Sequence, residues 1–138
     1  MKDLLCLKGV SLVYHSKEGE TLAVKDLSFC LRKNEYLSVV GPSGCGKTTV
    51  LSLISGLLRP SDGHVYIGGE EVIKPSASVG YMLQRDQLFE WRTIRENVVL
   101  GLEIQRKKNA ATLAFADNLL DKYGLSEFKS HYPRQLSG

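Results

Sequence analysis

The feature that most constrains this chain is a glycine-rich loop that directly follows an apolar run and directly precedes a helical pattern. The loop reads Gly-Pro-Ser-Gly-Cys-Gly-Lys-Thr over residues 41–48 and satisfies the pattern G-x-x-x-x-G-K-[ST]. Residues 36–40 before it are short and almost continuously apolar, which is typical of a strand buried on both faces of a parallel sheet. Strand, glycine loop and helix in this order predict an α/β fold.

This loop has the composition of a phosphate-binding site. Gly41, Gly44 and Gly46 let the main chain curl closely enough for several N–H groups to converge on phosphate oxygens. Lys47 is expected to bind the β- and γ-phosphates, aided by the dipole of the helix that begins there. Thr48 is expected to bind Mg²⁺ through its hydroxyl. A purely structural turn does not explain Lys-Thr at these two positions, so we expect a nucleotide site.

The residues expected to contact the nucleotide phosphates all lie in this loop or in the first helical turn. They are Gly41, Pro42, Ser43, Gly44, Cys45, Gly46, Lys47, Thr48 and Thr49. Cys45 stands where the motif allows any residue, so we interpret it as a bystander rather than a catalytic thiol. As a side hypothesis, alkylation of Cys45 is expected to block nucleotide binding.

The residues before the loop predict an antiparallel hairpin. Residues 4–14 are largely apolar, residues 16–20 form a polar turn, and the return strand alternates apolar with polar side chains. The apolar positions that define the two strands are Val10, Leu12 and Tyr14 in the first and Leu27, Phe29 and Leu31 in the second. An antiparallel section should therefore precede the phosphate loop.

Residues after the loop predict three helices and two short strands. The first helix starts at Lys47 and ends near Gly56, and strands are expected at residues 64–67 and 79–82. A polar loop over residues 84–92 precedes helices at about 93–102 and 109–123, and Gly124 is placed as the C-terminal cap of the last.

Composition excludes several classes of function. Eighteen basic and fifteen acidic side chains give a net charge of +3, dispersed along the chain, which does not favour nucleic acid as a partner. No run approaches the roughly 18 apolar residues of a spanning helix, and we expect no export signal. The chain has three cysteines, an odd number without metal-ligand spacing, at Cys6, Cys30 and Cys45. We therefore expect neither a disulfide framework nor a zinc site, and we expect the protein to reside in a reducing cytoplasm.

Four motifs in order make the chain resemble the ATP-binding cassette (ABC) family over almost its full length. The first is Tyr14, where the family places an aromatic that stacks on adenine, and the second is the phosphate loop. The third is residues 79–84, which resemble the Q-loop and end in Gln84. The fourth is Leu-Ser-Gly at residues 136–138, which follows Tyr-Pro-Arg-Gln and resembles the opening of the signature. The resemblance implies an ABC-type P-loop NTPase fold with an antiparallel β subdomain and part of the helical subdomain.

The resemblance also implies roles for particular residues. Lys47 and Gln84 would be the catalytic residues of this part, and Gln84 would also bind Mg²⁺ beside Thr48. Ser137 and Gly138 would bind the nucleotide of a second cassette. Alternatives stay open: Tyr14 could be a core or edge aromatic of the hairpin, Gln84 any polar residue after a strand, and Leu-Ser-Gly a common tripeptide.

Residues 88–98 are similar to those of importers of nitrate, sulfonate, taurine and related solutes. In many of these a proline precedes the tryptophan, whereas here Glu90 precedes Trp91. The family uses this region to contact a helix of its membrane permease, so an exposed Trp91 is expected to lie at that interface; the alternative is a tryptophan that closes a small core. No sustained heptad pattern is present, which favours a transporter-type cassette over the chromosome-organising relatives.

We expect residues 1–138 to be the N-terminal part of one ABC-type nucleotide-binding domain, with an incomplete core sheet. The family's Walker B strand, catalytic Glu and switch His would follow the signature, and we assign no role to the three histidines. The expected function is an ATP-binding subunit that powers solute import at the inner face of the cell membrane, with a permease, a second cassette and a solute-binding protein as partners. The alternatives are a nucleotide-binding module without turnover and a soluble ABC-type ATPase.

Overall fold

The structure is a computed structural model that describes residues 3–17, 19–83 and 87–136. The chain divides into two compact units, Met1–Tyr81 and Met82–Gly138, and each is described here by itself.

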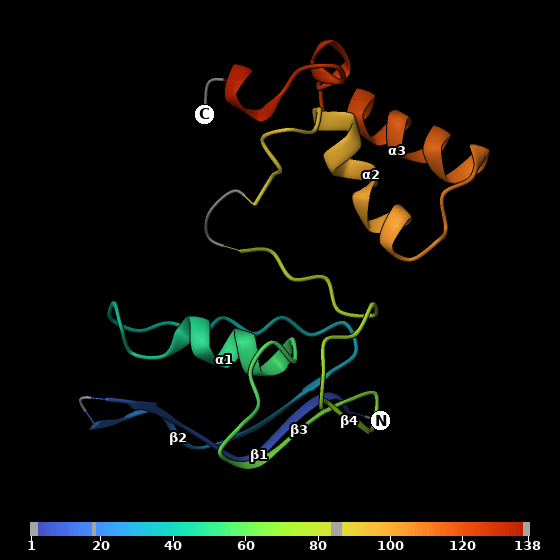
Figure 1. Cartoon of the computed structure of the whole chain (residues 1–138). Helices are drawn as coiled ribbons and strands as arrows, with labels where there is room; N and C mark the ends of the chain where they lie inside the picture. Colours follow the sequence, from blue (N-terminus) through green and yellow to red (C-terminus); the bar gives the residue numbers. More distant parts are fainter. Residues whose placement is uncertain (1–2, 18, 84–86, 137–138) are drawn as a thin grey trace. The chain divides into compact units, whose positions relative to one another are not determined.

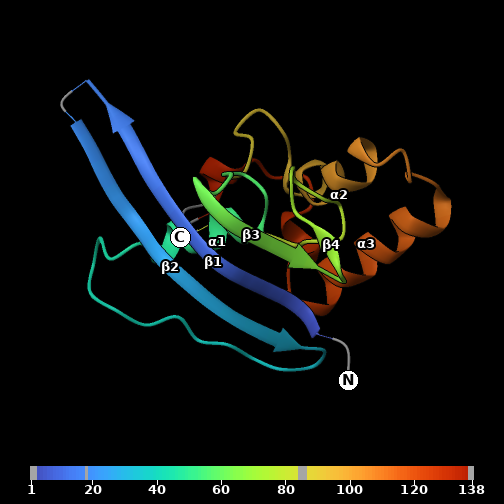
Figure 2. The same ribbon diagram turned by 90° about the horizontal axis from the view of Figure 1, so that it is seen from below.

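The first unit is an antiparallel sheet with one helix. Its elements are β1 (Asp3–Ser16), β2 (Gly19–Arg32), α1 (Lys47–Ile54), β3 (Asp62–Ile67) and β4 (Glu70–Glu71). The strand order is β2-β1-β3-β4 and all neighbours are antiparallel. Figure 1 shows α1 lying along one face of this sheet, and Figure 2 shows the long β1–β2 hairpin with β3 and β4 beside it. The predicted hairpin and the strand near residues 64–67 are confirmed.

The core of this unit lies between α1 and the sheet. Its buried side chains all come from β1, β2, β3 and α1, and they are Leu5, Leu7, Val10, Leu12, Val24, Val50, Leu53 and Val65. Leu27, Phe29 and Leu31 pack against this cluster from β2 while Ser28 and Cys30 between them are exposed, as the alternating pattern predicts.

A bulge in β1 explains why the buried positions change parity along the strand. Leu7 and Val10 are both fully buried although they are three residues apart, and the register with β2 shifts between them. Gly9 has φ of 59°, the left-handed conformation that glycine adopts without a Cβ penalty. The bulge thus keeps both ends of a long strand facing the core.

Two predicted strands are wrong. Residues 36–40 and 79–82 have no strand pairing, and the side chains of Tyr36 and Val40 are 101% and 86% exposed. A strand is held by hydrogen bonds from its neighbours, and no parallel strand pair occurs within residues 3–17, 19–83 and 87–136. The apolar run is therefore present without the sheet that would bury it, in agreement with an incomplete core sheet.

The sequence predicts no disulfide, and this prediction is also wrong. Cys6 of β1 and Cys30 of β2 are directly opposite in the hairpin register and form a disulfide, with their Cα atoms 4.2 Å apart. Non-hydrogen-bonded antiparallel pairs bring Cα atoms to about 4.5 Å. The spacing of 24 residues along the chain carries no sign of this proximity, which arises only from the hairpin register.

The second unit is a pair of helices followed by two 3₁₀ turns. α2 spans Ile94–Ile104 and α3 spans Ala110–Lys122, with 3₁₀ turns at Ser126–Phe128 and Pro133–Gln135. Buried side chains of both helices are Ile94, Val99, Ala116 and Leu120. Both helices were predicted, and Gly124, with φ of 73°, follows α3 as the expected C-terminal cap. In the part of the chain that the structure covers, no helix has the length and apolarity needed to cross a membrane.

One ion pair joins α2 to α3, and others join Glu103 of α2 to Arg92 before the helix and to Lys108 in the segment after it. Arg95 of α2 donates two hydrogen bonds to Asp117 of α3, from Nε to Oδ1 at 2.6 Å and from Nη2 to Oδ2 at 2.8 Å. These hydrogen bonds are the main reason why the pKa of Asp117 lies below its ordinary value. The pKa of Glu103 is lowered in the same way, chiefly by the hydrogen bond from Arg92.

We predict that the helical unit loses stability in acid and that Asp117→Asn removes part of this dependence. Because the pKa of Asp117 is lower in the folded state, its contribution is complete above the unfolded pKa of about 3.9 and disappears as the pH falls through the folded pKa. The thermal midpoint of Asp117→Asn, followed by circular dichroism, should lie below that of the wild type at pH 7, and the difference should shrink as the pH falls below the unfolded pKa of about 3.9. A constant difference from pH 7 to pH 3 would contradict this assignment.

Candidate nucleotide-binding site

The phosphate loop closely approaches the β1–β2 hairpin. Gly46 has φ of 94° and caps the N-terminus of α1, and a Cβ atom on it would lie 2.6 Å from the carbonyl oxygen of Ala23 in β2. Any L side chain at Gly46 would therefore meet both backbone strain and a steric overlap with β2. The glycine before the lysine is thus required by the packing of the loop on the hairpin as well as by its curvature.

Lys47 holds its ammonium over the loop that precedes it. Its Nζ donates to the carbonyl oxygens of Gly41 at 2.8 Å and Pro42 at 2.6 Å and lies 3.6 Å from Sγ of Cys45. The positive charge is therefore placed at the loop, half-buried, rather than extended into solvent. An ammonium so placed can turn from these carbonyls to phosphate oxygens that bind at the loop.

The N-terminus of α1 supplies further groups for an anion. The first turn of a helix leaves N–H groups without intrahelical partners, and no acidic side chain occupies this turn to compete with a phosphate. Thr48 is exposed and Thr49 is half-buried. Thr48 stands at the position where the motif places a Mg²⁺ ligand. These donors, together with Lys47, fit a magnesium-bound polyphosphate.

A cavity of about 280 Å³ lies between the loop and β2. Its lining includes Ala23 and Lys25 of β2, Cys45 of the loop and Lys47 of α1. Val39 and Val40, from the apolar run, form part of the same wall. The ammonium of Lys47 and the exposed thiol of Cys45 therefore border one space.

Tyr14 lies at the end of the hairpin that the phosphate loop approaches. It pairs with Thr21 across the hairpin, and Thr21 is two residues from Ala23, the residue that meets Gly46. Two residues of a strand span roughly 7 Å. Tyr14 is 42% exposed, so it is available for stacking and is not a core aromatic. The geometry brings Tyr14 and the loop to the same region of the first unit.

Three predicted site residues cannot be placed. Gln84, Ser137 and Gly138 lie outside the described residues. Their neighbours Leu83 and Leu136 are exposed and half-buried, respectively. The proposed metal role of Gln84 and the signature role of Ser137 and Gly138 therefore stay predictions.

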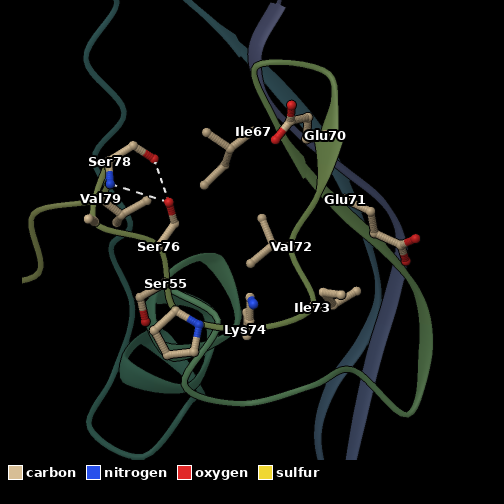
Figure 3. Close-up of a pocket in the computed structure, with 12 residues that line it drawn as sticks. Ser55, Ile67, Glu70, Glu71, Val72, Ile73, Lys74, Ser76, Ser78 and Val79 are labelled. Carbon is tan, nitrogen blue, oxygen red and sulfur yellow. Dashed lines mark hydrogen bonds between the residues drawn. The ribbon is translucent and has the colours of Figure 1, made fainter.

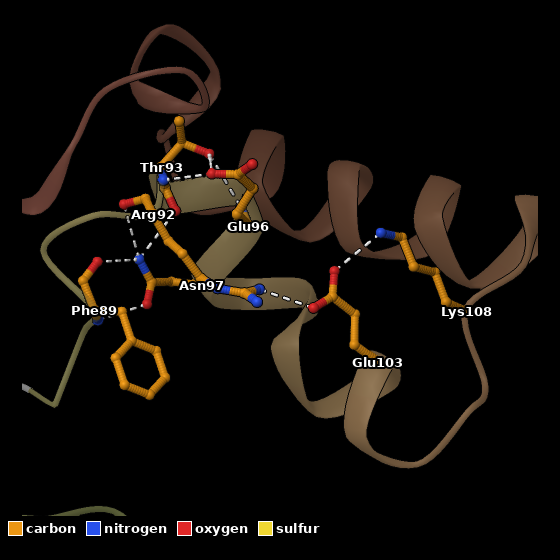
Figure 4. A network of polar contacts seen from close by, with 7 residues as sticks. All are labelled: Phe89, Arg92, Thr93, Glu96, Asn97, Glu103 and Lys108. Atoms are coloured by element: carbon orange, nitrogen blue, oxygen red, sulfur yellow. Dashed lines mark hydrogen bonds and ion pairs between the residues drawn. The ribbon is translucent and has the colours of Figure 1, made fainter.

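A hydrogen-bond network that the sequence did not reveal organises the turn around Trp91. Figure 4 shows Asn97 of α2 at its centre. Asn97 Nδ2 donates to the carbonyl oxygens of Phe89, Arg92 and Thr93 at 3.0 to 3.1 Å, and its Oδ1 accepts from the N–H of Phe89 at 2.8 Å. Trp91 is 72% exposed on this turn, with its ring centroid 4.7 Å from that of Phe89. The alternative of a tryptophan buried in a small core is wrong.

One signal for this network was present in the sequence. Thr93 and Glu96 have the spacing of a capping box, and in the structure each side chain bonds the backbone N–H of the other at the start of α2. Glu103, about two turns after Glu96, accepts from Arg92 at 2.8 Å and from Lys108 at 2.9 Å. The capping pattern fixes where α2 begins, whereas the contacts of Asn97 depend on how the preceding turn folds back.

A second pocket, of about 500 Å³, is lined by no residue of the phosphate loop, although Val79, the first residue of the 79–84 motif, borders it. Figure 3 shows it between β3, β4 and the segment after them, with Ile67 and Val72 pointing into it. Its described lining residues carry two carboxylates, on Glu70 and Glu71, and one ammonium, on Lys74. This charge does not favour a polyphosphate, so the loop, with Lys47 and the N-terminus of α1, is the better candidate for the nucleotide site.

Comparison with known proteins agrees with this geometry. A family model described as ABC transporter matches residues 24–138. Relatives include the uncharacterized ABC transporter ATP-binding protein YtlC of Bacillus subtilis, 46% identical over 94% of this chain and 50% of its own length, and the taurine import ATP-binding protein TauB of Pelagibacter ubique, 39% identical over 100% of this chain and 52% of its own. The chain thus spans about half the length of the curated relatives it matches.

A solved structure shares the fold. The dimeric, post-hydrolysis structure of the ATP-binding cassette MJ0796 bound to ADP and Pi superposes with a TM-score of 0.84 at 29% identity, over 96% of this chain and 63% of that one. The resemblance drawn from four short motifs is therefore confirmed by the family match, by the relatives and by the fold. This chain belongs to the ABC transporter family of ATP-binding proteins.

Proposed function

We propose that this chain is the nucleotide-binding front part of a subunit that binds Mg-ATP and powers the import of a small solute. The observation that carries the proposal is the ammonium of Lys47, held at 2.6 and 2.8 Å from loop carbonyls beside the N-terminus of α1. The relative TauB is named as a taurine import ATP-binding protein, which supports a solute in the sulfonate class. The proposed direction of transport and the proposed class of solute both rest on the similarity to TauB.

In this proposal, different residues bind different parts of the nucleotide. The loop N–H groups and Lys47 hold the phosphates and stabilise negative charge on the transferring phosphoryl group. Tyr14 stacks on the adenine from the hairpin end nearest the loop. Thr48 would hold Mg²⁺, which would neutralise phosphate charge when bound. Gln84 would transmit the state of the γ-phosphate to the following segment.

The proposed partners are a permease, a second cassette and a solute-binding protein, at the cytoplasmic face of the membrane. The exposed Phe89–Trp91 pair on a turn braced by Asn97 supports a rigid apolar contact with a permease helix. The dimeric state of the MJ0796 cassette supports a homodimer, in which Ser137 and Gly138 would reach the nucleotide of the opposite subunit. A dispersed net charge of +3 argues against nucleic acid.

Two alternative functions can be distinguished from solute import by experiment. A nucleotide-binding module without turnover would bind Mg-ATP and release no phosphate. A soluble ABC-type ATPase would associate with ribosomes or nucleic acid in place of hydrophobic membrane subunits. The exposed Trp91 favours the transporter, because an aromatic of this exposure is typical of a protein interface.

We predict that Lys47→Ala weakens Mg-ATP binding by about 10- to 100-fold, the loss that follows from removing charge-assisted hydrogen bonds to phosphate. Binding is measured by titration of a fluorescent ATP analogue, and phosphate release is followed on the same sample. The control is Lys33→Ala, which removes an equal charge from an exposed turn. Equal affinities of Lys47→Ala and wild type would contradict the placement of the site.

We predict that Mg-ATP protects Cys45 from alkylation. Sγ lies 3.6 Å from Nζ of Lys47, so phosphates bound at the loop would cover it. Without reductant Cys45 is the free cysteine of the described residues, because Cys6 and Cys30 are joined. At ATP ten times above its Kd, labelling by a maleimide should slow about tenfold, and the alkylated protein should no longer bind ATP. The same rate with and without ATP would count against the side hypothesis.

We predict that Trp91→Ala releases the membrane partner and leaves nucleotide binding intact. Removal of an interface aromatic typically costs about 2 kcal/mol, or roughly 30-fold in affinity. Recovery of permease subunits in a detergent pull-down is compared with that by Tyr123→Ala, which removes an aromatic of similar exposure from the end of α3. Full recovery by Trp91→Ala, or equal losses in both variants, would show that this turn is not the contact.

A further inference from the structure

The outer face of the sheet carries a row of polar and sulfur side chains that the nucleotide site does not use. Leu5 and Leu7 point into the core, so Cys6 between them points to the opposite face. In register with Cys6 are Cys30 on β2 and Tyr66 on β3. This face is covered by no helix of the first unit, since α1 packs on the other.

Asp3 completes a compact set of three metal-ligating side chains on this face. Its Oδ2 lies 3.6 Å from Sγ of Cys6, and the ligand atoms of Asp3, Cys6 and Cys30 all lie within 4.8 Å of one another. Around a tetrahedral zinc ion, with Zn–S of about 2.3 Å and Zn–O of about 2.0 Å, an oxygen and a sulfur ligand are about 3.5 Å apart. Asp3 and Cys6 already have this separation.

Space and charge beside the set are also suitable. A pocket of about 360 Å³ is lined by Asp3, Cys6, Lys8, Tyr66 and Gly69, so a bound ion could keep a water ligand. Two thiolates and one carboxylate carry three negative charges, of which a divalent cation neutralises two. Lys8 lines the same pocket as Asp3 and Cys6, so its positive charge can offset part of the remaining charge.

We propose that Asp3, Cys6 and Cys30 form a binding site for a thiophilic divalent cation of the zinc class when the two cysteines are reduced. The disulfide is the oxidised form of the same site. Two molecules of a small thiol reduce it to two cysteine thiols and leave as one small disulfide, and the cation then displaces the two thiol protons. Cation and disulfide exclude each other, and each links β1 to β2. The inference is independent of the nucleotide site.

The test measures cation binding directly. The purified protein is reduced, freed of reductant under nitrogen and titrated with Zn²⁺ against a chromophoric chelator, and in parallel with Co²⁺. We expect one cation per chain, with the near-ultraviolet absorption of thiolate-to-cobalt charge transfer. Protein oxidised to the disulfide should show neither. Absence of cation uptake by the reduced protein would overturn the proposal.

Variants separate this site from other thiols. Cys30→Ser should weaken binding by about 100-fold or more and Asp3→Asn by about 10-fold, whereas Cys45→Ser, which removes the remaining cysteine, should bind like the wild type. Asp3→Asn keeps both thiols and the strand pairing, so its loss of affinity cannot be attributed to unfolding. Unchanged binding in Cys30→Ser, or loss in Cys45→Ser, would show that the cation is held elsewhere and that the proposal is wrong.

Discussion

The packing of α1 on the inner face of the β1–β2 hairpin is the interaction on which the proposed nucleotide site depends. Val50 and Leu53 are buried against strand residues of the hairpin, and burial of such side chains contributes about 1.5–3 kcal/mol each. This contact fixes the direction of the helix N-terminus. It also brings Gly46 against the carbonyl oxygen of Ala23, so the loop has no room to move toward β2. The donors of the loop and the ring of Tyr14 are thereby held by one core.

Sequence reasoning was most successful where local patterns and local structure coincide. The hairpin, α1, α2 and α3 are each specified by alternation, by helical spacing or by caps within a few residues, and all four are present. Gly124 caps α3 for the same local reason. The loop motif likewise fixed Lys47 as the first residue of a helix, since the pattern itself contains the turn and the helix start.

The failures share a physical origin in contacts between distant residues. An apolar run such as residues 36–40 becomes a strand only when neighbouring strands offer hydrogen bonds, and its exposed Tyr36 and Val40 show that composition alone does not supply them. The juxtaposition of Cys6 and Cys30 follows from a hairpin register that shifts three times between the turn and this pair, and cysteine counting cannot reveal it. The contacts of Asn97 arise in the same way, from a turn that folds back on its helix.

The conformation of Lys47 has a consequence for how the loop binds an anion. Its ammonium already donates to the carbonyl oxygens of Gly41 and Pro42, so a bound phosphate would have to replace these two hydrogen bonds. The free energy gained from Lys47 on binding would then be only the difference between a phosphate and a carbonyl acceptor. That difference favours phosphate, because its negative charge adds the attraction between opposite charges to a hydrogen bond whose donor is already charged. Meanwhile the loop carbonyls keep the ammonium close to its working position, which reduces the entropy lost when the nucleotide binds. Affinity at this site therefore depends on preorganisation of the lysine as much as on its charge.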